Sequence, residues 1–482
     1  MAGVVSAVLV GGFMVPSAQA AEIDERAKNI ILLIGDGMGV THVNAARQRY
    51  VGVGNELNME QLAGLGSVST YSVERNNPSQ PVPVPDSAPT ATAWSSGVKT
   101  YNNAIGVDAF GNVVATIMEQ AKAAGLATGN VSTSEMTDAT PAAQYSHAQL
   151  RACQGPTQTS CSEGEANIAT QIARNGTADV ILGGGLSRFE PDDQVALEEQ
   201  GYTVLNDFGD ETLPLDQALQ TADTQRVATE ADLAAVPADA GKVFGLFNRG
   251  NLTVEKYKAE NPTAPEAAEP TLPEMTAKAI ELLTANEDDE GFFLQVEGAL
   301  IDKRSHANDA AQALQETITF DQAVQVARDF AATPEGEDTL IIVTADHECA
   351  GFNIIDNTTF TNAEATAPPG NVDSSNAANN SVPSRQSSAN VLDPARSTGP
   401  VNGVGSDNPT NFAPAFLRSF DDPADVVDGD PAASLALTYL SGNHTGANVP
   451  LFTEGPGSEQ LVGLIDQTEI YGAMTDALEG LG

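Results

Sequence analysis

The sequence predicts an α/β fold built around strands that are buried on both faces. Three apolar runs have the length and the β-branched content typical of such strands, namely Asn29 to Gly35, Gly291 to Val296 and Thr339 to Val343. Helix-like segments alternate with runs of this kind, as at Thr116 to Ala124, Pro273 to Asn286 and Ala307 to Phe330. Acidic or polar residues follow several of the strands directly, which is where open α/β sheets place ligand-binding groups.

The composition indicates a large folded protein that lives in salt. At 482 residues the chain is long enough for one large α/β domain or for two or three smaller ones. It has 65 acidic and 22 basic side chains, a formal net charge of −43, and only high ionic strength screens such self-repulsion. We therefore expect adaptation to high salt, with an ordinary acidic secreted protein as the alternative. The same charge disfavours a nucleic acid or an anionic membrane as a partner.

The N-terminal residues have the pattern of an export signal. Val4 to Val15 is apolar and uncharged, and Ser17 to Ala20 offers small residues for cleavage. We expect residues 1–20 to be a signal peptide and the mature protein to be periplasmic or secreted. The charged n-region is missing, so we expect the natural chain to begin further upstream. No later apolar stretch reaches the length of a membrane-spanning helix.

Candidate catalytic residues appear where the first strands end. Asp36 lies among glycines after the first strand, and Asp138 and Thr140 follow a strand expected at Ala127 to Ser134. Ser87 comes between an acidic residue and a nearby proline, which places it at a helix N-terminus, where free N–H groups favour an anion such as phosphate. The alternatives are a plain helix cap for Ser87 and a simple strand-to-helix turn for Asp36.

The second half of the chain contains candidate metal ligands. If the stretch after Glu297 is already helical, Asp302 and His306 are four residues apart on one face and can bind one metal ion. The alternative is a capped helix with a surface histidine. Three further candidates stand in polar contexts, Asp346, His347 and His444. The remaining two histidines, His42 and His147, lie in helix-like surroundings and are expected to be structural or at the surface.

These groups converge if one sheet holds the strands, because the carboxyl ends of parallel strands meet at one edge. Imidazole and carboxylate together suit zinc, whereas an all-oxygen set suits magnesium. Two metal ions can stabilise both the attacking and the leaving oxygen in phosphoryl transfer and help to activate a serine. Arg151 could then hold phosphate oxygens by two parallel hydrogen bonds, although a lone arginine is more often a surface charge.

Two further features concern cysteines and loops. Cys153 and Cys161 lie close together in a polar segment, and export favours a short disulfide loop between them. Cys349 is left over and is expected to be a buried thiol. Residues from about 358 to 414 shift to Asn, Ser, Pro and Gly, which predicts a loop-rich insertion that shapes a site entrance or a subunit contact, or a plain solvated loop.

One set of motifs, taken together and in order, is similar to those of the bacterial alkaline phosphatases. The matching stretches are residues 29–39, Asp86-Ser87-Ala88 with Thr92-Ala93-Trp94, residues 98–102, residues 138–143 with Arg151, residues 295–298 with 301–303 and His306, residues 344–347, and residues 444–446. The resemblance implies a central, mostly parallel sheet flanked by helices on both faces. It also implies one domain over residues 21–482, a crown-type insertion at about 358–414, and a homodimer.

The resemblance further implies a secreted enzyme that hydrolyses phosphate monoesters with broad specificity and releases inorganic phosphate. Ser87 would be the nucleophile that forms a covalent phosphoserine, and Arg151 would clamp the phosphate. Asp138 and Lys303 would act through water on the magnesium and on the phosphate. The resemblance implies two zinc ions and one magnesium ion, with the first zinc on Asp302, His306 and His444, the second on Asp36, Asp346 and His347, and the magnesium on Asp36, Thr140 and Glu297.

Some features depart from the family pattern, and other functions compete. The segment between His347 and His444 is longer than expected for a compact member, and Cys349 has no recognised counterpart. A related sulfatase would want an arginine two residues after the proline that follows Ser87, and the sequence lacks it. A phosphodiesterase need not have a counterpart of Arg151. A non-catalytic phosphate or metal scavenger needs no positioned nucleophile, so the Ser87 motif argues against it.

Overall fold

The computed structural model describes residues 26–52, 54–156, 160–209, 225–285, 291–307, 309–356, 411–416, 434–439 and 442–478. Its centre is a ten-stranded sheet with the strand order β17-β2-β16-β10-β1-β9-β5-β6-β8-β7. The strands are β1 (Asn29–Gly35), β2 (Gly64–Ser69), β5 (Ala127–Glu135), β6 (Val180–Gly184), β7 (Tyr202–Val204), β8 (Lys242–Leu246), β9 (Phe292–Gly298), β10 (Thr339–Thr344), β16 (Val449–Glu454) and β17 (Gly463–Asp466).

The sheet is mostly parallel, as predicted. Strand β1 pairs in parallel with both β9 and β10, and the parallel pairing continues from β9 through β5, β6 and β8 to β7. Only β16 runs against its neighbours, β10 on one side and β2 on the other. The carboxyl ends of β1, β5, β9 and β10 therefore meet at one edge of the sheet.

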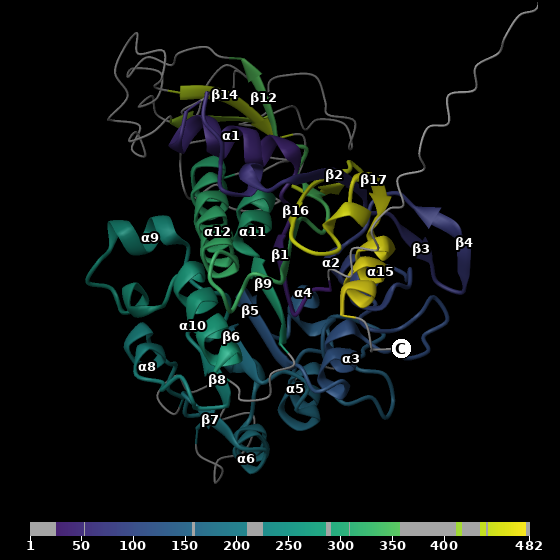
Figure 1. Cartoon of the computed structure of the whole chain (residues 1–482), viewed down its shortest axis with the longest axis vertical. Coiled ribbons are helices and arrows are strands. Elements are labelled where there is room, and N and C mark those ends of the chain that lie inside the picture. Colours follow the sequence, from purple (N-terminus) through teal and green to yellow (C-terminus); the bar gives the residue numbers. More distant parts are fainter. Residues whose placement is uncertain are drawn as a thin grey trace, which may run out of the picture.

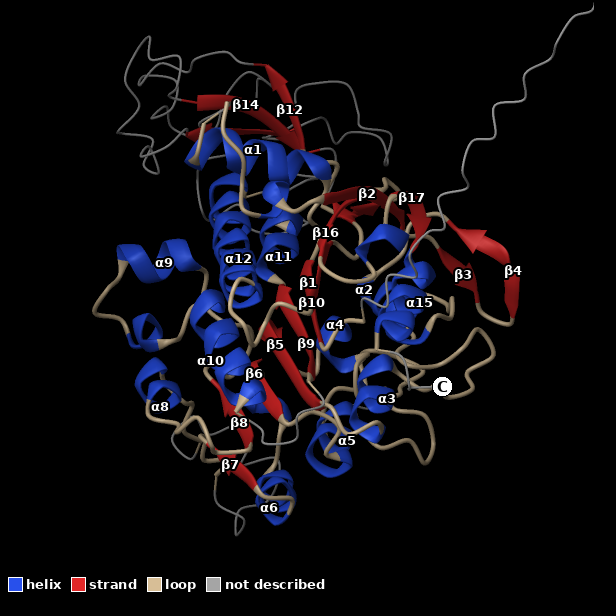
Figure 2. Cartoon of the chain, viewed as in Figure 1, coloured by secondary structure: helices blue, strands red, loops and turns tan. Residues whose placement is uncertain are grey.

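Helices cover both faces of this sheet, which also confirms the predicted architecture (Figures 1 and 2). One face is covered by α10 (Leu272–Thr284), α11 (Leu300–His306) and α12 (Ala310–Ala331), with α1 (Val40–Tyr50) against α12. The other face is covered by α2 (Ser87–Ser96), α3 (Ile117–Ala123), α4 (Ala139–Ala142) and α15 (Gln467–Ala477). The remaining described α-helices are α5 (Ile168–Asn175), α6 (Pro191–Glu199), α8 (Glu230–Ala234) and α9 (Glu255–Glu260).

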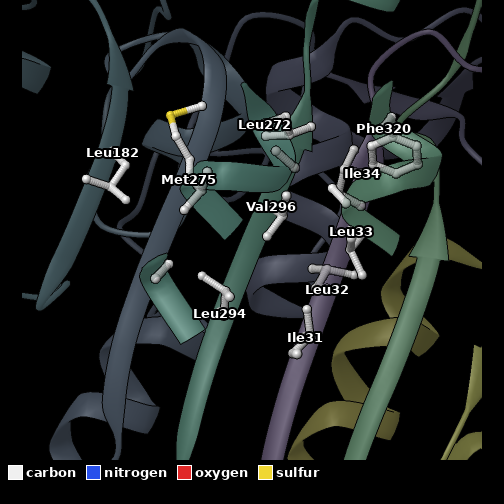
Figure 3. Close-up of a cluster of buried hydrophobic side chains, with 14 of the residues drawn as sticks. Ile31, Leu32, Leu33, Ile34, Leu182, Leu272, Met275, Leu294, Val296 and Phe320 are labelled. Atoms are coloured by element: carbon white, nitrogen blue, oxygen red, sulfur yellow. The ribbon is translucent and has the colours of Figure 1, made fainter. Parts of the chain in front are cut away.

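The core lies between the central strands and these helices. Every residue of β1, β9 and β10 is buried, as expected for strands with helices on both sides. Figure 3 shows side chains of β1, β9 and β6 gathered with Leu272 and Met275 of α10 and Phe320 of α12. Each fully buried Leu, Ile or Phe contributes about 1.5–3 kcal/mol to the stability of the fold. This packing holds in place the central strands whose carboxyl ends meet at one edge of the sheet.

Helix α10 is a clear case of sequence dictating local structure. The Thr271 side chain accepts a hydrogen bond from the Glu274 N–H, and the Glu274 carboxylate accepts one from the Thr271 N–H, which forms a capping box. Buried residues then recur at helical spacing, at Met275, Ala279 and Leu282, so one face of the helix packs on the sheet.

The structure corrects two expected elements. The helix expected at Ala307 to Phe330 is α12, which begins at Ala310 because Asp309 caps it by accepting a hydrogen bond from the Gln312 N–H at 3.0 Å; the stretch with Asp302 and His306 is a separate helix, α11. His147 lies in a loop rather than in helical surroundings.

Smaller sheets lie beside the main one. Strands β3 (Ser72–Glu74) and β4 (Asn77–Val82) form a hairpin, and β11 (Glu348–Cys349) pairs with β15 (His444–Thr445). Strand β14 (Ser434–Tyr439) lies between β12 (Asn353–Asp356) and β13 (Asn411–Phe416). The last residues of the predicted insertion thus form a strand, β13, instead of a loop.

The remainder of that insertion, residues 358–410, lies outside the described residues, as does the predicted signal peptide. None of the helices in the described part of the chain combines the length and the apolar character needed to cross a membrane.

Candidate active site

Ser87 is the first residue of α2, a helix whose residues are all buried. Asp86 precedes it in an extended conformation, and its carboxylate accepts a hydrogen bond from the Asn103 N–H at 2.8 Å. Ser87 is only 3% exposed, and its Oγ lies 3.2 Å from Nε2 of His347. The free N–H groups of the first turn therefore lie close to this hydroxyl, in a position that favours an anion.

A buried amide beneath the site ties α2 to the sheet. Oε1 of Gln295, on β9, accepts hydrogen bonds from Trp94 Nε1 at 3.1 Å and from Gln144 Nε2 at 2.5 Å. Nε2 of Gln295 donates to the Thr140 carbonyl at 3.1 Å and to Asn130 Oδ1 at 3.4 Å. The helix α2, which begins at Ser87, and the short helix α4, which contains Thr140, are thus held to the same strand.

The first cluster consists of Asp302, His306 and His444. Nε2 of His306 lies 3.2 Å from Oδ2 of Asp302 and 3.0 Å from Nε2 of His444. Nδ1 of His306 donates to the Gly442 carbonyl at 2.6 Å, and Nδ1 of His444 donates to the Pro85 carbonyl at 3.0 Å, because a carbonyl can only accept. When both imidazoles are neutral, the two Nε2 lone pairs face each other beside a carboxylate, an arrangement that suits a cation.

The second cluster consists of Asp36, Asp346 and His347, at the ends of β1 and β10. Nε2 of His347 lies 2.9 Å from Oδ2 of Asp346 and 3.8 Å from Oδ1 of Asp36. The other oxygen of Asp346 accepts hydrogen bonds from the N–H groups of Gly37 and His347, at 2.9 and 2.8 Å. Burial, and then the charges of Asp346 and Asp302, raise the pKa of Asp36 well above its usual range.

Both clusters fit divalent cations. In each, one ligand atom of every member lies within 4.8 Å of the others. Among the described residues, several buried oxygens at this edge have no hydrogen-bond partner, namely Asp36 Oδ1, Asp302 Oδ1, Asp346 Oδ2 and Thr140 Oγ1. Buried polar atoms are normally satisfied, and converging carboxylates repel one another without a counter-charge. Mixed imidazole and carboxylate donors are the set that zinc takes in proteins.

Glu297, near the end of β9, belongs to neither cluster. One of its oxygens accepts hydrogen bonds from Ser134 Oγ at 3.1 Å and from Ser132 Oγ. Burial raises the pKa of Glu297 to about 7, and its charge in turn raises the pKa of Asp36. The carboxylates of Glu297 and Asp36, together with Thr140 Oγ1, offer only oxygen donors, the kind that magnesium prefers.

Arg151 is fixed by two acids. Its Nη1 lies 2.9 Å from Oδ2 of Asp86, and its Nη2 lies 2.6 Å from Oδ1 of Asp138. The second oxygen of Asp138 lies 2.7 Å from Nζ of Lys303. Burial raises the pKa of Asp138, but Lys303 and Arg151 outweigh it and hold the pKa well below the usual range. One carboxylate therefore orients both cations.

A disulfide follows this arginine. Cys153 and Cys161 are bonded, as expected from their spacing, and Cys153 is fully buried. The Cys153 carbonyl accepts a hydrogen bond from the Ile168 N–H at 2.9 Å, at the start of α5. The loop that leaves Arg151 is thus anchored within a few residues of the site.

The other two histidines are structural. Burial lowers the pKa of His42 to about 3, and its Nε2 lies 2.9 Å from Ser305 Oγ on α11. His147 is partly buried, with Nε2 2.9 Å from Oε1 of Glu119. Both lie outside the two clusters.

Sequence reasoning missed three residues at the site. Gln295 belongs to a matched motif but was assigned no role. Glu348 accepts hydrogen bonds from Phe352 N–H at 3.0 Å and from Thr445 Oγ1, beside His444. Cys349, predicted only as a buried thiol, is buried but also lies within the first cluster. Its position just after Asp346 and His347 is the one signal that could have drawn attention to it.

A serine at a helix N-terminus, two clusters suited to divalent cations and an arginine held for an anion define a metal-dependent phosphoryl-transfer hydrolase. The predicted site residues come from both halves of the chain, with α2 and α11 on opposite sides of the central strands (Figure 1). Sequence comparison gives the family. Residues 27–405 match the alkaline phosphatase family, and this chain belongs to it. It is therefore a phosphoric monoester hydrolase that depends on metal ions.

Individual relatives agree with this assignment. An alkaline phosphatase of Escherichia fergusonii is 37% identical over 97% of this chain and 89% of its own length. The alkaline phosphatase of Escherichia coli is 37% identical over 94% of this chain and 87% of its own length. The crystal structure of a cold-active alkaline phosphatase from a psychrophilic Shewanella species superposes with a TM-score of 0.62 and 26% identity, covering 93% of this chain and 99% of that one.

Proposed function

We propose that this enzyme hydrolyses a broad range of phosphate monoesters through a covalent phosphoserine at Ser87, in a site with two zinc ions and one magnesium ion. The main support is the position of Ser87 Oγ, 3.2 Å from His347 of the second cluster. The two imidazole-containing clusters suit zinc, and the oxygen donors of Asp36, Thr140 and Glu297 suit magnesium.

Each step uses groups of this chain. The bound cations would supply positive charge that lowers the pKa of the hydroxyl and stabilises developing negative charge. Ser87 Oγ loses its proton to solvent and attacks the phosphorus, and the ester oxygen leaves as an alcohol after taking a proton from water. Water then attacks the phosphorus and loses a proton to solvent, the Oγ–P bond breaks, Ser87 Oγ takes up a proton, and inorganic phosphate departs.

Arg151 would hold the phosphoryl group during both displacements. Each of its amino groups has a second N–H beyond the one that faces Asp86 or Asp138, so two parallel hydrogen bonds to nonbridging oxygens remain available. Burial lowers the pKa of Arg151, but the two acids outweigh it and raise the pKa. The guanidinium is thus charged and oriented before substrate binds.

A pair of matched variants tests the covalent route. Ser87→Ala should reduce turnover of a nitrophenyl phosphate monoester by on the order of a thousandfold or more, since nucleophile deletions cost up to about a millionfold. Ser95→Ala is the control, because Ser95 is equally buried in the same helix but lies away from the site. Both variants should still bind zinc and phosphate. Unchanged turnover in Ser87→Ala would refute the covalent route.

Trapping the intermediate provides a direct check. Labelled phosphate bound by the wild type, followed by acid denaturation and trypsin, should leave label on the peptide from Asn76 to Lys99. The Ser95→Ala protein should be labelled equally, and the Ser87→Ala protein should not. Label elsewhere, or none in the active wild type, would contradict the proposal.

We further propose that the mature protein is exported, dimeric and adapted to high salt. The disulfide supports export, because such bonds persist outside the reducing cytosol. The net charge of −43 supports salt adaptation, and the family resemblance supports a homodimer. Light scattering on the purified protein would measure the mass, and fractionation of a host would locate it. A monomeric cytosolic protein would contradict the first two parts.

A further inference from the structure

The sulfur of Cys349 lies within the first cluster. Its Sγ and the ligand atoms of Asp302, His306 and His444 all lie within 4.8 Å of one another. Cys349 is fully buried and is not part of the disulfide. Its Sγ–H group donates a weak hydrogen bond to the Asp302 carbonyl, at 3.8 Å.

The backbone holds this cysteine in place. Strands β11 and β15 are antiparallel, and their register pairs Cys349 directly with His444. On the opposite side, Gly37 has a φ of +71°, and a Cβ there would lie 2.8 Å from Cβ of Cys349 and 2.8 Å from Oδ1 of Asp302. A glycine is therefore needed for the thiol and the carboxylate to lie so close together.

A second observation points to a cation at this place. Oδ1 of Asp302 is buried without a hydrogen-bond partner, and it lies 3.5 Å from Nε2 of His444. The Nε2 atoms of His306 and His444 are 3.0 Å apart. Two nitrogens, one carboxylate oxygen and one sulfur are four donors of the kinds that zinc takes in proteins.

We propose that the Cys349 thiolate is a fourth protein ligand of the ion in the first cluster. The inference rests on the proposed zinc site and adds a ligand to it. As the ion binds, the S–H bond breaks, the proton passes to solvent and a sulfur–metal bond forms without any change of oxidation state. The soft sulfur donor favours zinc or cadmium over magnesium at this cluster, whereas the second cluster has only nitrogen and oxygen donors.

Cobalt substitution of the whole enzyme tests the ligand directly. Wild-type protein stripped with a chelator and reloaded with Co²⁺ should show a near-ultraviolet sulfur-to-cobalt charge-transfer band, and Cys349→Ser should lack it. X-ray absorption of the zinc-loaded wild type should show a sulfur neighbour at about 2.3 Å. Because this last measurement needs no variant, poor folding of Cys349→Ser cannot obscure the result.

A variant of the second cluster serves as the matched control. Asp346→Asn weakens only that cluster, so its cobalt form should keep the charge-transfer band. Cys349→Ser should also release one metal ion to a chelator at least about tenfold faster than the wild type, by analogy with losses of supporting metal contacts. Wild-type zinc protein with neither a sulfur neighbour nor the band would overturn the assignment. If such protein still hydrolysed monoesters, the proposed function would stand without this ligand.

Discussion

Replacement of Gln295 by leucine should weaken both the fold and the catalytic site. Leucine has a similar size but no polar atoms, so the buried donors Trp94 Nε1 and Gln144 Nε2 lose the acceptor that they share. Each stranded buried group costs about 1–3 kcal/mol, which predicts a loss of about 2–6 kcal/mol in the free energy of unfolding. That is a large part of the roughly 5–15 kcal/mol by which proteins are stable.

Urea unfolding provides the assay, because Trp94 is the chain's single tryptophan and reports on this network. The control is Gln322→Leu, the same change at an exposed position of α12, which should alter stability by less than about 0.5 kcal/mol. The turnover of Gln295→Leu should also fall, by roughly a hundredfold if α2 shifts by about 1 Å. If both variants unfold at the same urea concentration, the network does not stabilise the site and the reasoning is wrong.

Four further outcomes are expected. Burial and the charge of Glu255 raise the pKa of Glu316 from 4.5 to about 8. Between these two pH values the folded state binds more protons than the unfolded state, so the free energy of unfolding falls as the pH rises. Glu316→Gln should remove this loss, which is up to about 5 kcal/mol and can be measured by thermal unfolding at acidic and alkaline pH. If the stability of the wild type and of the variant changes equally with pH, the reasoning is wrong. Arg151→Lys keeps the positive charge but loses the two parallel hydrogen bonds to the phosphoryl oxygens. It should lower kcat/KM by roughly ten- to a hundredfold. Chelation should abolish activity and lower the melting temperature, with both restored by zinc and magnesium, because metal binding stabilises the folded state. Activity and stability should rise with salt from near zero, and a protein equally stable without salt would refute the interpretation of its charge.

The central strands could be predicted because burial on both faces leaves a simple signal. The run from Asn29 to Gly35 is the whole of β1, and the strands near residues 292 and 339 were placed within two residues at each end. Strand β7 was missed, because three residues at the sheet edge with mixed burial give no periodic pattern. The start of α12 was placed at Ala307 instead of Ala310, because the sequence before Asp309 remains favourable to helix.

The chemistry of the site was predictable where ligands follow strands. Asp36, Asp346 and His347 owe their convergence to the parallel pairing of β1 with β10; the apolar runs indicated buried strands of one sheet, but not which strands are neighbours. Asp138 and Arg151 are 13 residues apart, but Lys303, which binds the other oxygen of Asp138, lies 165 residues away, and local sequence has no information about that contact. The same holds for Cys349, whose neighbour His444 is fixed by a two-residue strand pair.

The order in which the chain is made sets when activity can begin. His306 and His444 are 138 residues apart, and β16, which supports β10 beside Asp346, comes later still. A ribosome-bound chain that has not yet released this C-terminal part lacks a complete first cluster, and such distant contacts form late in folding. We therefore expect the nascent protein to lack activity toward phosphate esters until this C-terminal part has been made.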